Sequence, residues 1–136
     1  MGLQSDVPDI WNYSAFVEGQ LLGSTEFRID ENRLRLWSGI FDWPAMSERL
    51  SVSLLVSAMM EAYLHVAQPR PPGNIHAGQK LWLHGRAPHL GEALTVTTRV
   101  AGKEERKGRK WLAFESNITS GGDWLLKGEI LTIWAE

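Results

Sequence analysis

The stretch that decides the fold runs from Pro71 to Glu92 and reads PPGNIHAGQKLWLHGRAPHLGE. Its prolines and Gly73 end an apolar helical pattern, and its second half enters an alternating, strand-like pattern. It also carries three of the four histidines of the chain. A connection of this kind between a helix and a sheet often frames a site. We therefore expect functional residues here.

The segment before this stretch has the longest helical pattern in the sequence. It begins at Ser47, which is followed by Glu48, and it ends at Val66. Its apolar residues cover more than one stripe of a helix surface: Leu50, Val52, Leu54, Leu55, Ala58, Met59, Ala62, Tyr63 and Val66. A helix that is apolar on so many sides is expected to be buried along its length.

The segments after this stretch read as strands, because they alternate or are rich in β-branched residues. Their expected ranges are 79–86, 93–100, 110–118 and 124–134, and a weaker strand is expected within 16–29. Residues 102–109 are expected to form a solvated hairpin tip. One long helix followed by an antiparallel meander predicts an α+β fold, in which a curved sheet buries one face on the helix.

Composition limits the classes of protein to which the chain can belong. Its 136 residues, of which 43% are hydrophobic, suffice for the core of one domain, and we expect a single domain over 1–136. Its 14 basic and 16 acidic side chains give a net charge of -2, which attracts neither nucleic acid nor an anionic membrane surface. The chain has no cysteine, so disulfides, thiolate nucleophiles and zinc-thiolate sites are excluded.

The location expected from the sequence is the cytoplasm. The first residues contain no basic region before an apolar run, and no run approaches the roughly 20 apolar residues of a membrane span. The lack of cysteine is compatible with a reducing compartment.

The order of these elements resembles the hotdog fold. The corner Pro88-His89-Leu90-Gly91, which opens a strand beginning Glu92-Ala93-Leu94-Thr95-Val96, is most similar to the MaoC-like dehydratase and hydratase superfamily. Residues 73–79, GNIHAGQ, resemble a loop in the N-terminal, dehydratase-like half of double-hotdog proteins, and the similarity spans about residues 27–134. The resemblance implies a curved antiparallel sheet wrapped around one long central helix.

The same resemblance implies an activity and a partner. Its members carry out (R)-specific hydration or dehydration of 2-enoyl and 3-hydroxyacyl thioesters, with the acyl thioester of coenzyme A or an acyl carrier as substrate and no further cofactor. Because one hotdog sheet leaves an open edge, a homodimer or a heterodimer with a related hotdog chain is expected. No nucleic acid, membrane or metal is expected as a partner.

One motif departs from the superfamily. Active hydratases resemble one another in a G-D-x-N-P-(L/I/V)-H signature, whose Asp and His act on water and on the α-proton of the substrate. Alignment on Pro44 puts Phe41 at the Asp position and Met46 at the His position. Met46 cannot transfer a proton, and Asp42 reaches the acid position only through a shift of one residue. The resemblance therefore leaves two alternatives open: a self-sufficient enzyme with a shifted acid, or a partner half that helps to shape the acyl tunnel for a catalytic half, as the N-terminal halves do.

Three residues are candidate catalytic groups, each with a structural alternative. Asp42 is a shifted acid or a turn-capping residue. The imidazole of His76 can bond a thioester carbonyl or carry a proton, or it caps a loop. Glu61, in the most apolar part of the helix, can activate water as in some hotdog thioesterases, or it extends to an exposed flank.

Four residues are candidate substrate-binding groups. Asn74 and the backbone amides near Gly78 can donate to a thioester oxygen, although a turn explains the same glycines. Trp43 and Trp82 are large rings that suit an acyl-binding wall or simple packing. Two other functions stay open on these residues: an acyl-CoA thioesterase that uses Glu61 or Asp42, and a non-catalytic module that binds acyl or aromatic ligands.

Overall fold

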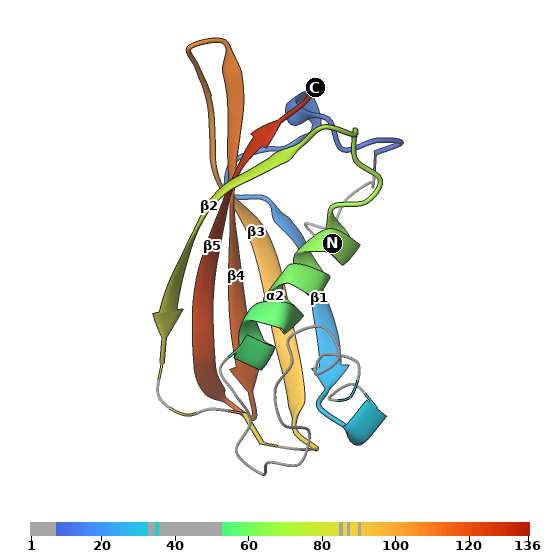
Figure 1. The fold of residues 1–136 in the computed structure, drawn as a ribbon, viewed down its shortest axis with the longest axis vertical. Coiled ribbons are helices and arrows are strands. Elements are labelled where there is room, and N and C mark those ends of the chain that lie inside the picture. The colour runs from blue at the N-terminus through green and yellow to red at the C-terminus, as the bar shows by residue number, and fades with distance from the viewer. Residues whose placement is uncertain (1–7, 33–34, 36–52, 85, 87, 90) are drawn as a thin grey trace.

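Five antiparallel strands curve around one side of a helix in a computed structural model of the chain (Figure 1). The structure describes residues 8–32, 35, 53–84, 86, 88–89 and 91–136. Its elements are a 3-10 helix η1 (Tyr13–Ala15), β1 (Leu21–Arg28), α2 (Ser53–Val66), β2 (Ile75–Leu83), β3 (Ala93–Arg106), β4 (Arg109–Ser120) and β5 (Asp123–Trp134). The strand order is β1-β3-β4-β5-β2, so β1 and β2 form the two edges. This confirms the predicted α+β arrangement of a curved sheet around a long helix.

The core lies between α2 and the concave face of the sheet. Every second residue of the three central strands points toward the helix, as strand geometry requires. The buried apolar set from these strands is Leu94, Val96, Val100, Leu112, Phe114, Ile118, Leu125, Leu126, Ile130 and Trp134. The helix contributes Leu54, Leu55, Ala58, Met59, Ala62 and Tyr63. The alternating patterns of the sequence therefore identified the concave face correctly.

The helix is not buried on all sides. Leu64 is 37% exposed and His65 is exposed, whereas Met60 and Glu61 are half-buried. The prediction of burial along the whole length is therefore wrong for the side of α2 that faces away from the sheet. Apolar residues on that side lack a cover within the described part of the chain, and the expected first turns, residues 47–52, lie outside that part.

The helix packs closely on β5 at Gly128. A Cβ atom at this position would lie 2.0 Å from Sδ of Met59 and 3.5 Å from Leu81. A hydrogen in place of a side chain thus lets the fully buried Met59 lie directly on the strand backbone.

Two predicted boundaries are wrong. Residues 73–79 were expected as a loop, but β2 begins at Ile75, because pairing with β5 from Ile75↔Ile133 onward supplies backbone hydrogen bonds to this segment. The solvated tip expected at 102–109 is also shorter. β3 continues to Arg106 and β4 starts at Arg109, which leaves a two-residue turn.

The segment before β1 closes one end of the core. Phe16 is buried, its ring stacks on Trp11 with centroids 4.7 Å apart, and the indole Nε1 of Trp134 donates to the Trp11 carbonyl at 2.7 Å. Trp11 and Trp134 thus serve as packing residues. None of the described helices has the length and apolar character to cross a membrane.

Candidate functional site

A cavity of about 330 Å³ opens between the last turns of α2 and the start of the edge strand β2. Its lining residues are Met60, Tyr63, Leu64, Arg70, Pro71, Pro72, Gly73, Asn74, Ile75, His76 and Thr132. Met60 and Leu64 give it an apolar wall on the helix side, whereas Arg70, Asn74 and His76 give it polar groups on the other side. We call this space the edge cavity.

Tyr63 and Arg70 are paired in the edge cavity. Tyr63 is 4% exposed, and the guanidinium carbon of Arg70 lies 5.5 Å from the centroid of its ring. Burial raises the pKa of the Tyr63 hydroxyl, and the charge and hydrogen bond of Arg70 offset part of this effect. The hydroxyl therefore stays protonated at neutral pH and can serve as a donor.

The Asn74 side chain is fixed through its amide oxygen, and its amide nitrogen can still donate a hydrogen bond. Its Oδ1 accepts a 2.8 Å hydrogen bond from the backbone N–H of Ala135, which fixes the side chain. Its Nδ2 is buried and has no hydrogen-bond partner among the described residues. A buried donor without a partner costs about 1–3 kcal/mol, and a ligand acceptor in the edge cavity would relieve this cost.

His76 is the second residue of β2. Its partner in the register is Thr132, whose buried hydroxyl is already used as a donor to the Leu112 carbonyl at 2.9 Å. The register shifts between His76 and Gly78, which marks a bulge at this point of the edge. The imidazole is exposed. It is therefore accessible to a ligand and holds no buried partner in place.

The geometry brings together two of the predicted site residues, Asn74 and His76. Glu61 is half-buried on α2 and does not line the edge cavity. Gly78 faces Leu131, with ordinary contact distances of 3.9–4.0 Å for an added Cβ, and it does not line the cavity either. Asp42 and Trp43 lie outside the described residues.

Trp82 occupies the opposite face of the sheet. It is 40% exposed and lies under the ammonium of Lys127, which is 4.9 Å from the ring centroid. Its neighbour Leu81 points to the helix side, where it lies near Gly128, so alternation directs Trp82 away from the helix. Trp82 therefore lies on the convex face, away from the edge cavity.

Tyr63 is a site residue that sequence reasoning missed. Tyr63 belonged to an apolar helical pattern, which predicts burial and says little about the hydroxyl. A signal was present, because a buried tyrosine usually needs a polar partner and Arg70 follows at the helix end.

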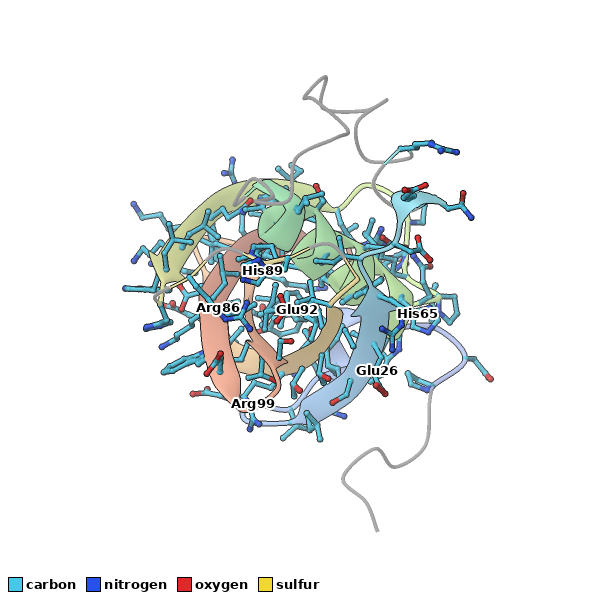
Figure 2. All side chains as sticks on the ribbon, turned by 90° about the horizontal axis from the view of Figure 1, so that it is seen from below. Glu26, His65, Arg86, His89, Glu92 and Arg99 are labelled. Carbon is cyan, nitrogen blue, oxygen red and sulfur yellow. The ribbon has the colours of Figure 1, made fainter. Side chains whose placement is uncertain are left out.

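A second polar cluster lies at the other end of the sheet, where Figure 2 shows Arg86 and Glu92 side by side. Arg86 donates from both terminal nitrogens to the Glu92 carboxylate and from Nε to Asp123 Oδ2 at 3.0 Å. Glu92 also accepts from the His89 backbone N–H at 2.9 Å and from Ser120 Oγ at 2.6 Å. These bonds lower the pKa of Glu92 to about 2, with the Arg86 hydrogen bonds as the main cause. The cluster ties two loops to the sheet.

No metal site is formed by these side chains. Within the described ranges, no three histidine, aspartate or glutamate residues are close enough together to hold a metal ion. His84 stacks on Trp124 with ring centroids 4.0 Å apart, on the sheet rather than in the edge cavity.

The fold is similar to that of several solved structures. The MaoC-like dehydratase from Rhodospirillum rubrum aligns with a TM-score of 0.72 at 17% identity, covering 93% of this chain and 98% of that one. The (R)-hydratase from A. caviae involved in PHA biosynthesis aligns with a TM-score of 0.69 at 16% identity, covering 89% and 98%. The C-terminally truncated HadBC complex of Mycobacterium tuberculosis, a 3R-hydroxyacyl-ACP dehydratase, aligns with a TM-score of 0.64 at 12% identity, covering 80% and 90%.

Searches against protein-family models and curated proteins gave no match. At these identities the structural likeness establishes the fold and leaves the activity to be argued from the site. The sheet order, the single long helix and the near-complete coverage of the neighbours agree with the resemblance drawn over about residues 27–134. The chain adopts the hotdog fold that MaoC-like dehydratases and (R)-hydratases share.

Proposed function

We propose that this chain binds an acyl thioester in the edge cavity and forms one half of a 2-enoyl/3-hydroxyacyl thioester hydratase or dehydratase. In this proposal a related hotdog chain supplies the acid and the base. The observation that carries the proposal is the edge cavity itself, which joins an apolar helix wall to the unused Asn74 donor beside the open edge of the sheet.

The two sides of the edge cavity suit the two parts of an acyl thioester. Met60 and Leu64 offer the apolar surface that an acyl chain needs, whereas Asn74 Nδ2 and the exposed His76 can donate to the thioester oxygen. Donors that are fixed before the ligand arrives stabilise developing negative charge on such an oxygen. A hydratase needs this charge stabilisation and, in addition, a proton carrier.

The need for a partner follows from the sequence signature. Phe41 and Met46 stand where the superfamily has its Asp and His, so this chain lacks the usual dyad at these positions. Two structural neighbours from Mycobacterium tuberculosis, HadBC and ChsH1–ChsH2, are complexes of two chains, which supports a two-chain assembly for this protein as well.

The edge strand β2 supplies the surface for such a pairing. Its side chains are exposed along nearly the whole strand, among them Ile75 at 55%, Leu81 at 42% and Leu83 at 56%. An open edge with apolar side chains is the feature that a second sheet covers. Antiparallel pairing of two such edges would place the second chain beside the edge cavity, because the cavity lies at the start of β2.

Crotonyl-pantetheine tests the proposal, since its thioester arm is common to coenzyme A and carrier proteins. We expect the chain to bind it in calorimetry and, without a partner, to hydrate it very slowly. Asn74→Ala should weaken binding about tenfold, because it removes the donor to the thioester oxygen. Asn117→Ala, which removes an amide on the convex face, is the matched control.

Two results would overturn the proposal. One is the absence of binding to crotonyl-pantetheine by a folded chain. The other is equal binding by the Asn74→Ala and Asn117→Ala variants, which would move the ligand out of the edge cavity. Fast hydration by this chain alone would keep the cavity assignment and remove the partner from the proposal.

A further inference from the structure

The β3–β4 hairpin ends in a concentration of positive charge. Five of the 14 basic and two of the 16 acidic residues lie within 103–110, a net charge of +3, which leaves -5 on the remaining chain. We call residues Arg106–Arg109 the hairpin tip. Its three basic side chains are exposed, and together with Trp111 they line a hollow of about 580 Å³.

Two features of the hairpin tip lower its own stability. Arg106 and Arg109 are direct cross-strand partners, and like charges in this position destabilise a hairpin. Lys107 has a φ of 53°, a left-handed conformation that glycine or asparagine adopts more easily. The guanidinium of Arg106 lies over the Trp111 ring at 5.0 Å, and its Nη1 lies 3.8 Å from a carboxylate oxygen of Glu104, so these contacts offset part of the cost. Local costs of this kind are common at functional sites.

The hairpin tip and the edge cavity lie at the same end of the molecule. In Figure 1 the orange hairpin projects beyond the sheet at the end where α2 finishes and β2 begins. The pairings Trp111↔Ile133 and Ile75↔Ile133 put Trp111 in one row with Ile75, which lines the edge cavity. Adjacent strands are about 4.8 Å apart, so this row spans about 10 Å.

We propose that the hairpin tip docks the acidic face of a protein that carries the acyl thioester on a flexible arm. The inference rests on the proposed function for the arm and its cargo, and it names a carrier protein rather than coenzyme A as the substrate carrier. A protein docked on the tip has the edge cavity within reach of its arm, because the two sites share one end of the sheet.

Charge also favours a compact acidic protein over a nucleic acid. A polyanion binds along an extended basic track, and each neutralised phosphate adds to its affinity. Here the basic track is confined to the hairpin tip, while the remaining chain carries a charge of -5 and repels a long polyanion. An acidic protein face needs to contact the tip alone.

The experiment measures binding of a crotonylated acyl carrier protein by fluorescence anisotropy at low and high salt. We expect Arg109→Glu to weaken binding about tenfold at low salt, and added salt to weaken wild-type binding, because exposed charges are screened. Arg99→Glu, the same change on the convex face, should leave binding within about twofold. Equal losses for the two variants, or no binding by wild type, would overturn the docking surface.

The variant Lys107→Asn tests whether the charges of the hairpin tip contribute to binding. Asparagine tolerates the left-handed conformation, so this variant should raise the melting temperature by about 2–4 °C. It should also weaken carrier-protein binding several-fold, because one charge is lost. A gain in stability with unchanged binding would contradict the proposal.

Two controls keep this proposal apart from the proposed function. Crotonyl-pantetheine binding should be unchanged in Arg109→Glu, since the hairpin tip lies outside the edge cavity. If wild type binds crotonyl-pantetheine but not the carrier protein, the docking surface is wrong and the acyl site stands. Binding of a 20-nucleotide RNA through Arg109, with none of the carrier protein, would replace the docked protein with a nucleic acid.

Discussion

Glu92 is a single residue on which two loops depend. Its carboxylate accepts from four donors: two on Arg86, the backbone N–H of His89 and the hydroxyl of Ser120. Glu92→Gln removes the charge and breaks the bidentate pair, which should lower the free energy of unfolding by about 2 kcal/mol. Glu26→Gln, an exposed change on β1, is the control for denaturant unfolding at pH 7.

The same carboxylate predicts how stability depends on pH. The folded protein holds the pKa of Glu92 at about 2, below its ordinary value of 4.5, so the unfolded state binds a proton first as the pH falls. This contribution is complete above pH 4.5 and declines as the pH approaches 2. Unfolding midpoints measured from pH 6 to pH 2 should fall less in Glu92→Gln than in wild type.

His76 should behave as a ligand contact. The side chain is exposed, so its removal leaves no buried group without a partner. His76→Ala should therefore change the melting temperature by less than about 1 °C and weaken crotonyl-pantetheine binding several-fold. Both quantities are measured on one sample. A destabilised variant with unchanged affinity would assign the ring a structural role instead.

At the scale of elements, the close packing of α2 on β5 depends on the lack of a side chain at Gly128. Gly128→Ala would place a methyl group at the thioether end of Met59, a flexible side chain that is fully buried and has to repack within the core to make room. The variant should lose about 1–3 kcal/mol of stability through overpacking. Gly78→Ala adds the same methyl group to β2 at ordinary contact distance and should cost less than about 1 kcal/mol. Equal losses would show that the close approach at Gly128 does not matter.

The elements also show how far sequence reasoning reaches. The concave faces of β3 and β4 were predictable, because burial alternates from Leu94 to Val100 and from Leu112 to Ile118. The start of β2 was not, because Gly73, Asn74 and Gly78 favour a turn, and pairing with β5 overrides that local preference. The contact between Tyr63 and Arg70 in the edge cavity depends on tertiary packing, which the apolar helical pattern alone does not encode.

At the scale of the whole molecule, we predict assembly through β2. Leu83 is 56% exposed on this edge, and a lysine there would place a charge in the interface. Sedimentation should show that Leu83→Lys shifts a wild-type dimer to monomer. Val17→Lys, at an apolar residue that is 62% exposed and lies before β1, should leave the dimer intact. A stable wild-type monomer at micromolar concentration and without a partner would count against pairing by identical chains.

The exposed edge has a consequence for producing the protein. Strand β2, which reads IHAGQKLWL, pairs with β5 on one side only, so it offers the backbone groups of its other side and three successive apolar side chains to a second chain. Two-fold symmetric pairing covers the β2 edges of both chains and stops at a dimer. Pairing in a shifted register leaves part of an edge open, to which further chains can add. Lys80, in the middle of the strand, disfavours such stacking. We therefore expect the solubility of freshly synthesised chains to depend on how quickly each one meets its proper partner.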